Sequence, residues 1–267
     1  MTLRLSVLAG LAALALASPA AQAADDSTVD LELVLAVDVS RSMDTDEQEL
    51  QRAGYVSAFR HPEVVQAIRR GMIGKIAVTY IEWAGPQFQS VVVPWTKIST
   101  QGESEAFAAR LDAAPLTREF GTAISGGLLF ASSQFPFSGE KGERRVIDVS
   151  GDGPNNMGPP VLEARERVLA EGITINGLPL VLKTATSVTA YGIPNLDIYY
   201  EDCVIGGPGA FMVTVNSLDG FDDAVRRKLV LEIASVPPLL HRAAEVMREP
   251  RIDCLIGEKA REFWLDR

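Results

Sequence analysis

The chain has 267 residues, a formal net charge of −10, 47% hydrophobic residues and 22% charged residues. This composition is ordinary for a globular protein, and the length allows one large domain or one domain with an extension. The acidic balance disfavours nucleic acid and anionic membrane surfaces as partners, because neutralising phosphates requires clustered lysine and arginine. We therefore expect no nucleic-acid partner.

The N-terminus has the features of a secretory leader. Arg4 precedes an apolar stretch over residues 5–17, and residues 21–23 (AQA) have the small-x-small form that signal peptidase accepts. The apolar stretch is shorter than the ~20 residues that a membrane-spanning helix needs. We therefore predict a bacterial signal peptide over residues 1–23 and a periplasmic or secreted mature chain that starts at Ala24. A retained N-terminal anchor is the alternative.

The sequence contains two cysteines, Cys203 and Cys254. A periplasmic or extracellular location permits disulfides, so we predict one bridge between them. Two buried free thiols are the alternative. Because Cys254 lies near the C-terminus, the bridge would tie the tail back to the body of the protein.

Segments typical of strands alternate with segments typical of helices along the mature chain. Residues 29–37 form an apolar run typical of a strand buried on both faces, and residues 45–60 repeat apolar side chains at helical spacing. A helix should restart at Pro62, and two strands should pair around a turn at residues 85–86. The predicted elements from there on are strands over 75–83 and 89–95, helices over 104–113 and 122–133, a strand over 145–149, a helix over 160–171, a strand over 174–181, a short helix over 195–204, a strand over 210–215 and a helix over 221–234.

This alternation predicts an α/β fold with a doubly wound, mostly parallel sheet flanked by helices and one antiparallel edge strand. The sequence VPP at residues 236–238 breaks the pattern, and a helical C-terminal extension should follow it. We therefore divide the chain into a signal peptide over 1–23, one domain over 24–235 and an extension over 236–267.

Three polar turns should meet at one edge of this sheet. The turn after the first long strand carries Asp38, Ser40 and Ser42 at alternate positions. The second turn ends in Thr122, ahead of a helix of small residues, and the third carries Asp152 directly after a buried strand. Ligands of doubly wound sheets bind at the carboxyl ends of the strands. A set of ligands made only of oxygen suits a hard cation, so we predict Mg²⁺ or Mn²⁺ here, with Ca²⁺ as a less strict fit.

The chemistry of these ligands indicates what the site would do. Hydroxyls are weak ligands, so a cation held mainly by them keeps uncompensated positive charge and attracts an anionic oxygen from outside. We therefore predict that the site captures a carboxylate of a partner protein or peptide. Arg41, between the two serines, is placed to clamp such an acidic ligand, and an ion pair with a neighbouring residue is the alternative.

The motifs DVSRSM, GT and SGDG, in this order, resemble the metal-ion-dependent adhesion site of von Willebrand factor type A domains. The resemblance extends over about residues 29–234, and it matches five positions to the motif: Asp38, Ser40, Ser42, Thr122 and Asp152. It implies that the serines and the threonine touch the metal, while the aspartates often act through water. The segments GYVSAF, YIEWAG and DCVIGGPGAF further resemble a bacterial, secreted group of such proteins.

Each motif also has a simpler explanation. The serines would cap the following helix, with Asp44 or Asp46 as alternative caps. Asp152 would be an ordinary turn residue between glycines. Thr117 competes with Thr122 for the threonine position, although it lacks a preceding glycine. Three matched elements in the right order favour the metal site over these separate explanations.

An enzyme is the main competing class. A serine hydrolase would need a nucleophile with a histidine base, but of the two histidines His61 precedes a proline in a predicted turn between helices and His241 lies in the C-terminal extension. Ser150 lacks the flanking glycine of a nucleophile elbow. A phosphotransfer enzyme would prefer a second carboxylate where Ser40 stands. We therefore predict a non-enzymatic, metal-dependent protein-binding module, with a metal-dependent hydrolase or phosphatase as the alternative. A structural role with a permanently bound metal is a third possibility.

Overall fold

The computed structural model describes residues 27–182, 188, 192–217, 219–234 and 250–265. The strands are β1 (Thr28–Val29), β2 (Leu31–Asp38), β3 (Ile76–Trp83), β4 (Gln89–Ile98), β5 (Lys141–Gly142), β6 (Arg145–Gly151) and β7 (Thr174–Pro179). The helices are α1 (Thr45–Arg60), α2 (Pro62–Arg69), α3 (Gln101–Ala113), α4 (Ile124–Ser132), α5 (Val161–Ala170), α6 (Leu196–Tyr199), α7 (Phe221–Ile233) and α8 (Ile256–Leu265). A 3₁₀ turn at Phe135–Phe137 and a π-helical turn at Tyr200–Val204 complete the set of described elements.

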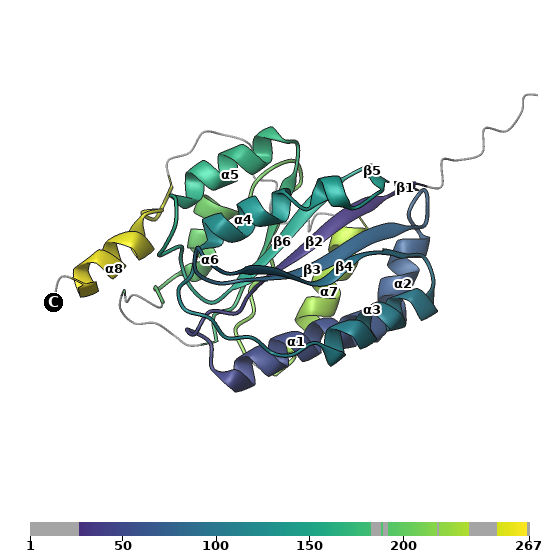
Figure 1. Ribbon diagram of the computed structural model, residues 1–267, viewed down its shortest axis with the longest axis horizontal. Coiled ribbons are helices and arrows are strands. Elements are labelled where there is room, and N and C mark those ends of the chain that lie inside the picture. Colours follow the sequence, from purple (N-terminus) through teal and green to yellow (C-terminus); the bar gives the residue numbers. More distant parts are fainter. Residues whose placement is uncertain (1–26, 183–187, 189–191, 218, 235–249, 266–267) are drawn as a thin grey trace, which may run out of the picture.

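Five strands form the main sheet, in the order β4-β3-β2-β6-β7. Strand β2 runs parallel to β3 and β6, and β6 runs parallel to β7, whereas β4 pairs antiparallel with β3 at one edge. Helices α1, α2, α3 and α7 cover one face of the sheet and α4, α5 and α6 cover the other (Figure 1). The predicted α/β fold with one antiparallel edge strand is confirmed.

Strand β2 lies at the centre of this sheet, and every residue in it is buried. Side chains alternate between the two faces of a strand, and both faces are apolar here. Leu33 and Leu35 pack into the core against α1 and α7, while Val34 and Ala36 pack into the core against α4 and α5. The continuous apolar run thus corresponds to a strand covered on both sides.

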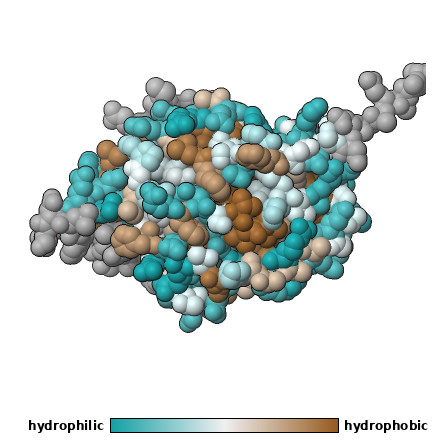
Figure 2. Space-filling model, in the orientation of Figure 1, coloured by the Kyte–Doolittle hydropathy of each residue, from teal (hydrophilic) through white to brown (hydrophobic). Residues whose placement is uncertain are grey.

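Strand β4 forms an edge of the sheet that is protected against pairing with another chain. Pro94 has no N–H to offer such a partner, and Lys97 forms an ion pair with Glu140 at 2.9 Å. Proline and charged side chains on an edge strand are typical features that prevent edge-to-edge aggregation. Figure 2 shows a largely polar face of the molecule with an apolar patch near its middle.

The observed elements follow the predicted ones closely, with one correction. Segment 210–215 is not a strand, because only isolated bridges join Met212 to Gly177 and Val215 to Leu180. The chain turns just before this segment, where Gly207 and Gly209 have φ of +93° and +72°. After this turn the backbone runs parallel to the end of β7, where Gly177 N–H donates to Phe211 O at 3.1 Å and Val215 N–H donates to Pro179 O at 3.0 Å, but the pairing is too interrupted to form a regular strand.

The predicted disulfide is present. Cys203 and Cys254 form a bridge with an S–S distance of 2.01 Å and a Cα–Cα distance of 5.6 Å, so the alternative of two free thiols is wrong. Helix α8 belongs to the predicted C-terminal extension. The predicted leader, residues 1–23, and the first part of the extension, residues 236–249, lie outside the described residues.

Candidate functional site

The turn after β2 brings Asp38, Ser40 and Ser42 together. Asp38 is the fully buried last residue of β2, and its Oδ1 accepts a hydrogen bond of 2.7 Å from the backbone N–H of Ser40. The Oγ atoms of Ser40 and Ser42 are also 2.7 Å apart. Helix α1 starts only at Thr45, where Asp44 caps it and forms a capping box with Glu47. The two serines are therefore not helix caps.

Asp152 joins this group from the loop after β6. The Ser42 hydroxyl donates a hydrogen bond of 2.5 Å to Asp152 Oδ1. Strands β2 and β6 are neighbours in the sheet, with Val37 opposite Ser150, so their carboxyl ends lie side by side. Asp38, Ser40, Ser42 and Asp152 thus form one hydrogen-bonded chain across two adjacent strands.

Thr122 lies at the same edge, in the segment that precedes α4. The backbone of Glu119 pairs with the β2 turn, donating to Val39 O and accepting from Arg41 N. Thr122 itself donates its backbone N–H to Asn156 Oδ1 at 3.0 Å, and its carbonyl accepts from Asn156 N at 2.9 Å. The segment thereby joins the loops that carry Ser40 and Asp152.

The rival threonine is engaged elsewhere. Burial raises the pKa of the Glu82 carboxyl, whereas Arg52 and, to a smaller extent, a side-chain hydrogen bond with Thr117 oppose this rise. Glu82 is in turn paired with Arg52 in the buried space between β3 and α1. The contacts of Thr117 therefore give it a structural role.

The electrostatics of the site favour a positive ion. Burial raises the pKa of Asp38 well above its ordinary value, the nearby charge of Asp152 raises it further, and hydrogen bonds from Ser40 and from the backbone of Asp152 oppose both. Within the described part of the chain, Asp38 Oδ2 accepts no hydrogen bond although it is fully buried. An unpaired buried carboxylate oxygen is costly, and a cation beside it would stabilise both carboxylates.

The donor set also fits the chemistry of a hard divalent cation. Carboxylate and hydroxyl oxygens are the groups that Mg²⁺, Mn²⁺ and Ca²⁺ select. No group of three or more His, Cys, Asp or Glu side chains within the described ranges is arranged to hold a metal. A site at this edge therefore depends on the hydroxyls of Ser40, Ser42 and Thr122 as well as on the two aspartates.

Two adjacent tyrosines, Tyr199 and Tyr200, lie beneath this edge. The Tyr199 hydroxyl accepts a hydrogen bond of 3.1 Å from the backbone N–H of Asn155. A Cβ atom placed on Gly151 would lie 2.8 Å from the Tyr200 hydroxyl and 3.0 Å from Asp38 Oδ2, so these two buried oxygens are neighbours. Because an adjacent aromatic pair in a sequence is typical of a hydrophobic core, the sequence did not indicate that these two tyrosines contact the candidate site.

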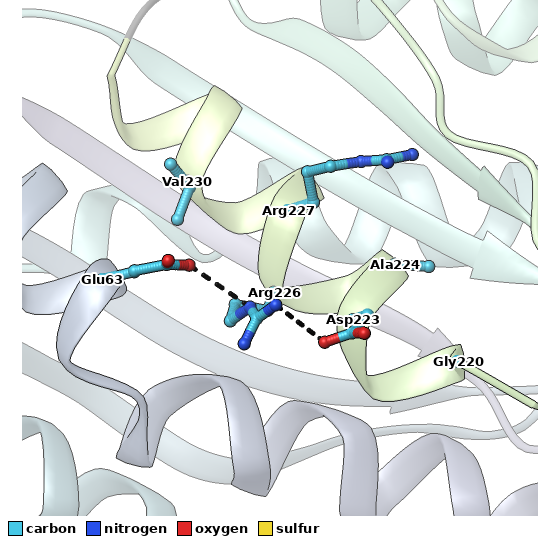
Figure 3. Close-up of a pocket in the computed structure, with 7 residues that line it drawn as sticks. All are labelled: Glu63, Gly220, Asp223, Ala224, Arg226, Arg227 and Val230. Carbon is cyan, nitrogen blue, oxygen red and sulfur yellow. Dashed lines mark ion pairs between the residues drawn. The ribbon is translucent and has the colours of Figure 1, made fainter.

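A pocket of about 340 Å³ lies elsewhere, beside α2 and α7 (Figure 3). Arg226 dominates it and forms ion pairs with Glu63 at 3.3 Å and Asp223 at 2.7 Å. Arg226 also contacts the His61 ring at 3.0 Å. Because neighbouring side chains already pair the charge of Arg226, we assign no ligand to this pocket.

The residues weighed for an enzyme do not assemble a catalytic group within the described ranges. His61 caps α2 and lies against Arg226, with no serine, threonine or cysteine hydrogen-bonded to it among the described residues. Ser150 is fully buried and accepts a hydrogen bond of 3.1 Å from Gln51. His241 lies outside the described residues.

The sequence of the chain identifies its family. Residues 28–237 match the model of the family described as "Protein of unknown function (DUF1194)". The chain belongs to this family. The match covers the sheet and the helices α1–α7 of this DUF1194 member and ends before the segment that contains α8. No curated protein matches the chain.

Solved structures show which fold this DUF1194 member has. Proximal thread matrix protein 1 from the mussel byssus superposes with a TM-score of 0.55 at 17% identity, covering 78% of this chain and 49% of that one. The pilus adhesin SpaC from Lactobacillus rhamnosus GG gives 0.56 at 16% identity, covering 77% and 30%. A von Willebrand factor type A structure from Catenulispora acidiphila gives 0.53 at 12% identity, covering 77% and 43%. The fold is therefore that of a von Willebrand factor type A domain.

These likenesses extend to the fold and no further. The DUF1194 member spans about half of the mussel protein and less than a third of the pilus adhesin. Another structure of the mussel protein, with a TM-score of 0.50 at 15% identity over 75% of this chain and 46% of that one, is described as having a zinc occupied MIDAS motif.

Within the described ranges, no helix is both long enough and apolar enough to cross a bilayer.

Proposed function

We propose that this protein is a metal-dependent binding module that captures an acidic residue of a partner protein or peptide. The observation that carries the proposal is the chain of hydrogen bonds from Asp38 through Ser40 and Ser42 to Asp152, which ends in a buried carboxylate oxygen without a partner among the described residues. A mussel matrix protein and a bacterial pilus adhesin with the same fold support a binding role.

Each residue has a part in this proposal. Ser40, Ser42 and Thr122 offer neutral hydroxyl oxygens, and Asp38 and Asp152 offer negative ones, directly or through water. A divalent cation held there, Mg²⁺ or Mn²⁺ in preference to Ca²⁺, would supply an open coordination position for an anionic oxygen. Because the hydroxyls are neutral, part of the charge of the cation is not neutralised, and a carboxylate of the partner would neutralise it.

The rim of the site offers further contacts for such a partner. Arg41 is exposed, and within the described residues it forms no ion pair, which favours the ligand clamp over the structural alternative. Phe120 and Leu116, on the loop beside it, are 57% and 43% exposed. We propose that the partner carries an acidic residue close to an apolar one in the same short segment. Arg41 would then contact the acidic part of this segment, and Phe120 would contact the apolar part.

The proposed location is the periplasm or the exterior of a bacterium. The disulfide is typical of oxidising compartments, and the leader-like residues 1–23 indicate export. We retain the division into a leader over 1–23, a domain over 24–235 and an extension over 236–267 as part of this proposal.

Calorimetric titration of Mg²⁺ and Mn²⁺ tests the proposal. The wild-type protein should bind one ion, and Asp152→Ala should weaken that binding at least about 100-fold, since it removes a charged ligand and loosens Ser42. Equal metal affinity in the two proteins would refute the site. The matched control is Arg41→Ala, which should leave the metal affinity unchanged while weakening the binding of a short acidic peptide.

A phosphoester assay on the same proteins addresses the enzyme alternative. The binding module should show no metal-dependent turnover of a generic phosphoester. Turnover that Asp38→Asn abolishes would replace the binding module with a metal-dependent phosphatase.

A further inference from the structure

The segment over residues 250–265, here called the C-terminal segment, is fastened to the body of the protein. Cys254 forms the disulfide with Cys203 in the π-helical turn. Arg251 adds ion pairs with Glu201 at 2.5 Å and with Asp202 at 2.8 Å, both on the same turn. The bridge is buried, with Cys203 fully covered and Cys254 6% exposed, so solvent has little access to it.

Beyond this attachment, the C-terminal segment contacts the loop after β6, where its hydrogen bond goes to Asn155. Asn155 is fully buried, and its Nδ2 donates hydrogen bonds to Glu258 Oε1 at 2.7 Å and to Pro159 O at 3.1 Å. Its Oδ1 accepts from the backbone N–H of Ser125, in α4, at 3.0 Å. All the hydrogen-bonding groups of this side chain are therefore used, and one of the partners is a carboxylate from α8.

The approach of α8 to Asn155 depends on a glycine. A Cβ atom on Gly257 would lie 2.2 Å from the carbonyl oxygen of Asn155 and 3.0 Å from Cγ of Pro154. Real side chains do not tolerate the shorter of these distances, so any residue larger than glycine would push α8 away from the loop. Gly257 thus allows helix and loop backbone to touch directly.

This contact falls on the loop that organises the proposed metal site. Asn155 follows Asp152 by three residues. Its neighbour Asn156 holds Thr122 through two hydrogen bonds of 3.0 and 2.9 Å. Helix α8 therefore packs on a loop that carries one proposed metal ligand and positions a second.

We propose that the C-terminal segment is a clamp that holds loop 152–157 in the conformation the cation site requires, with Gly257 and Glu258 as its contact residues. The effect on metal affinity rests on the proposed function, whereas the effect on the loop does not. Outer residues that orient metal ligands typically change metal affinity 10- to 100-fold when they are replaced.

Hydrogen exchange on the metal-free, oxidised full-length protein tests the clamp by itself. Gly257→Ala should speed amide exchange in loop 152–157 at least several-fold, because displacing α8 removes the support of Asn155. The matched control is Gly102→Ala. Gly102 is the second residue of α3, as Gly257 is of α8, and nothing lies within 4 Å of its Cβ position. Exchange in loop 152–157 that is equally slow in both variants would overturn the clamp.

Titration of Mn²⁺ into the same proteins tests the link to the site. Gly257→Ala and Glu258→Leu should each lower Mn²⁺ affinity about 10-fold, while Glu258→Gln, which keeps an oxygen acceptor for Asn155, should restore most of it. Faster exchange of the loop with unchanged Mn²⁺ affinity would overturn the positioning role. A wild-type protein that binds no Mn²⁺ would refute the proposed function, and the exchange result would still decide whether the clamp exists.

Discussion

At the scale of single residues, Asp38 combines a structural cost with a proposed function. Its carboxyl is fully buried, close to the charge of Asp152, and its Oδ2 lacks a hydrogen bond from any described residue. Asp30 shows the contrast, because its carboxylate accepts hydrogen bonds from three successive backbone N–H groups at 2.9, 2.7 and 3.3 Å. Functional sites often contain residues that lower the stability of the fold, and a buried carboxylate that suits a cation is such a residue.

Asp38→Asn should therefore raise the melting temperature of the protein in a chelator, by a few degrees, because it removes a buried charge beside Asp152. The same variant should gain less stability than wild type when Mg²⁺ is added. Asp30→Asn serves as the control and should lower the melting temperature in both conditions. Thermal unfolding followed by circular dichroism gives these values, and a lower melting temperature for Asp38→Asn in chelator would contradict the account.

Glu232 makes the stability of the protein depend on pH. Lys228 Nζ lies 2.5 Å from both Glu232 Oε1 and Asp148 Oδ1, in a fully buried group between α7 and β6. Burial, and then the charge of Asp148, raise the pKa of Glu232 from 4.5 to about 7, with Lys228 opposing them. The folded state therefore binds more protons than the unfolded state between pH 4.5 and about 7.

It follows that this group stabilises the fold most at low pH, and that its contribution is lost as the pH rises toward about 7. The loss approaches about 1.4 kcal/mol for each pH unit of that interval. Glu232→Gln keeps the side-chain shape and removes the titration, so its free energy of unfolding should fall less between pH 5 and pH 7. Urea unfolding across that range measures both proteins, and parallel pH profiles would rule out the assignment.

At the scale of secondary-structure elements, local sequence predicted most of what is observed. Helix α1 spans the predicted residues 45–60 because Asp44 and Glu47 form a capping box and Pro62 restarts the chain as α2. The predicted strand over residues 210–215 is observed only as isolated bridges: after the turn at Gly207 and Gly209 the chain runs parallel to the end of β7, but the pairing is interrupted. Periodicity detects an extended segment, but it does not detect whether the pairing of that segment with a neighbouring strand is continuous.

The disulfide links the π-helical turn at Tyr200–Val204 to the turn that precedes α8, and its effect on stability follows from the length of the loop it closes. The two cysteines are 51 residues apart, so closing this loop should stabilise the fold by about 4 kcal/mol in the chain-entropy model. The double variant Cys203→Ser/Cys254→Ser should unfold at clearly lower urea concentration than wild type. If reduction of the wild-type protein leaves the urea midpoint unchanged, the bridge has no such role.

At the scale of the whole molecule, the sequence motifs predicted the fold and which residues meet, but not what supports them. Asp38 ends β2, and Ser40, Ser42 and Asp152 lie in the turns that follow β2 and β6, so the topology alone brings them to one edge. The support of Asn155 by Glu258 joins residues 103 positions apart. It depends on a contact between a glycine and a backbone carbonyl, which composition and periodicity do not reveal.

The cleavage before Ala24 remains a prediction, and the intact mass of the exported protein would measure it.

The proposed function requires a divalent cation among Asp38, Ser40, Ser42, Thr122 and Asp152. The most direct test is an anomalous difference map from crystals of the protein grown with Mn²⁺. We expect one strong peak within coordination distance, about 2.0–2.6 Å, of the Ser40 and Ser42 hydroxyls at the carboxyl edge of β2 and β6. A map with no peak at this edge, in crystals that hold Mn²⁺ at another place, would contradict it.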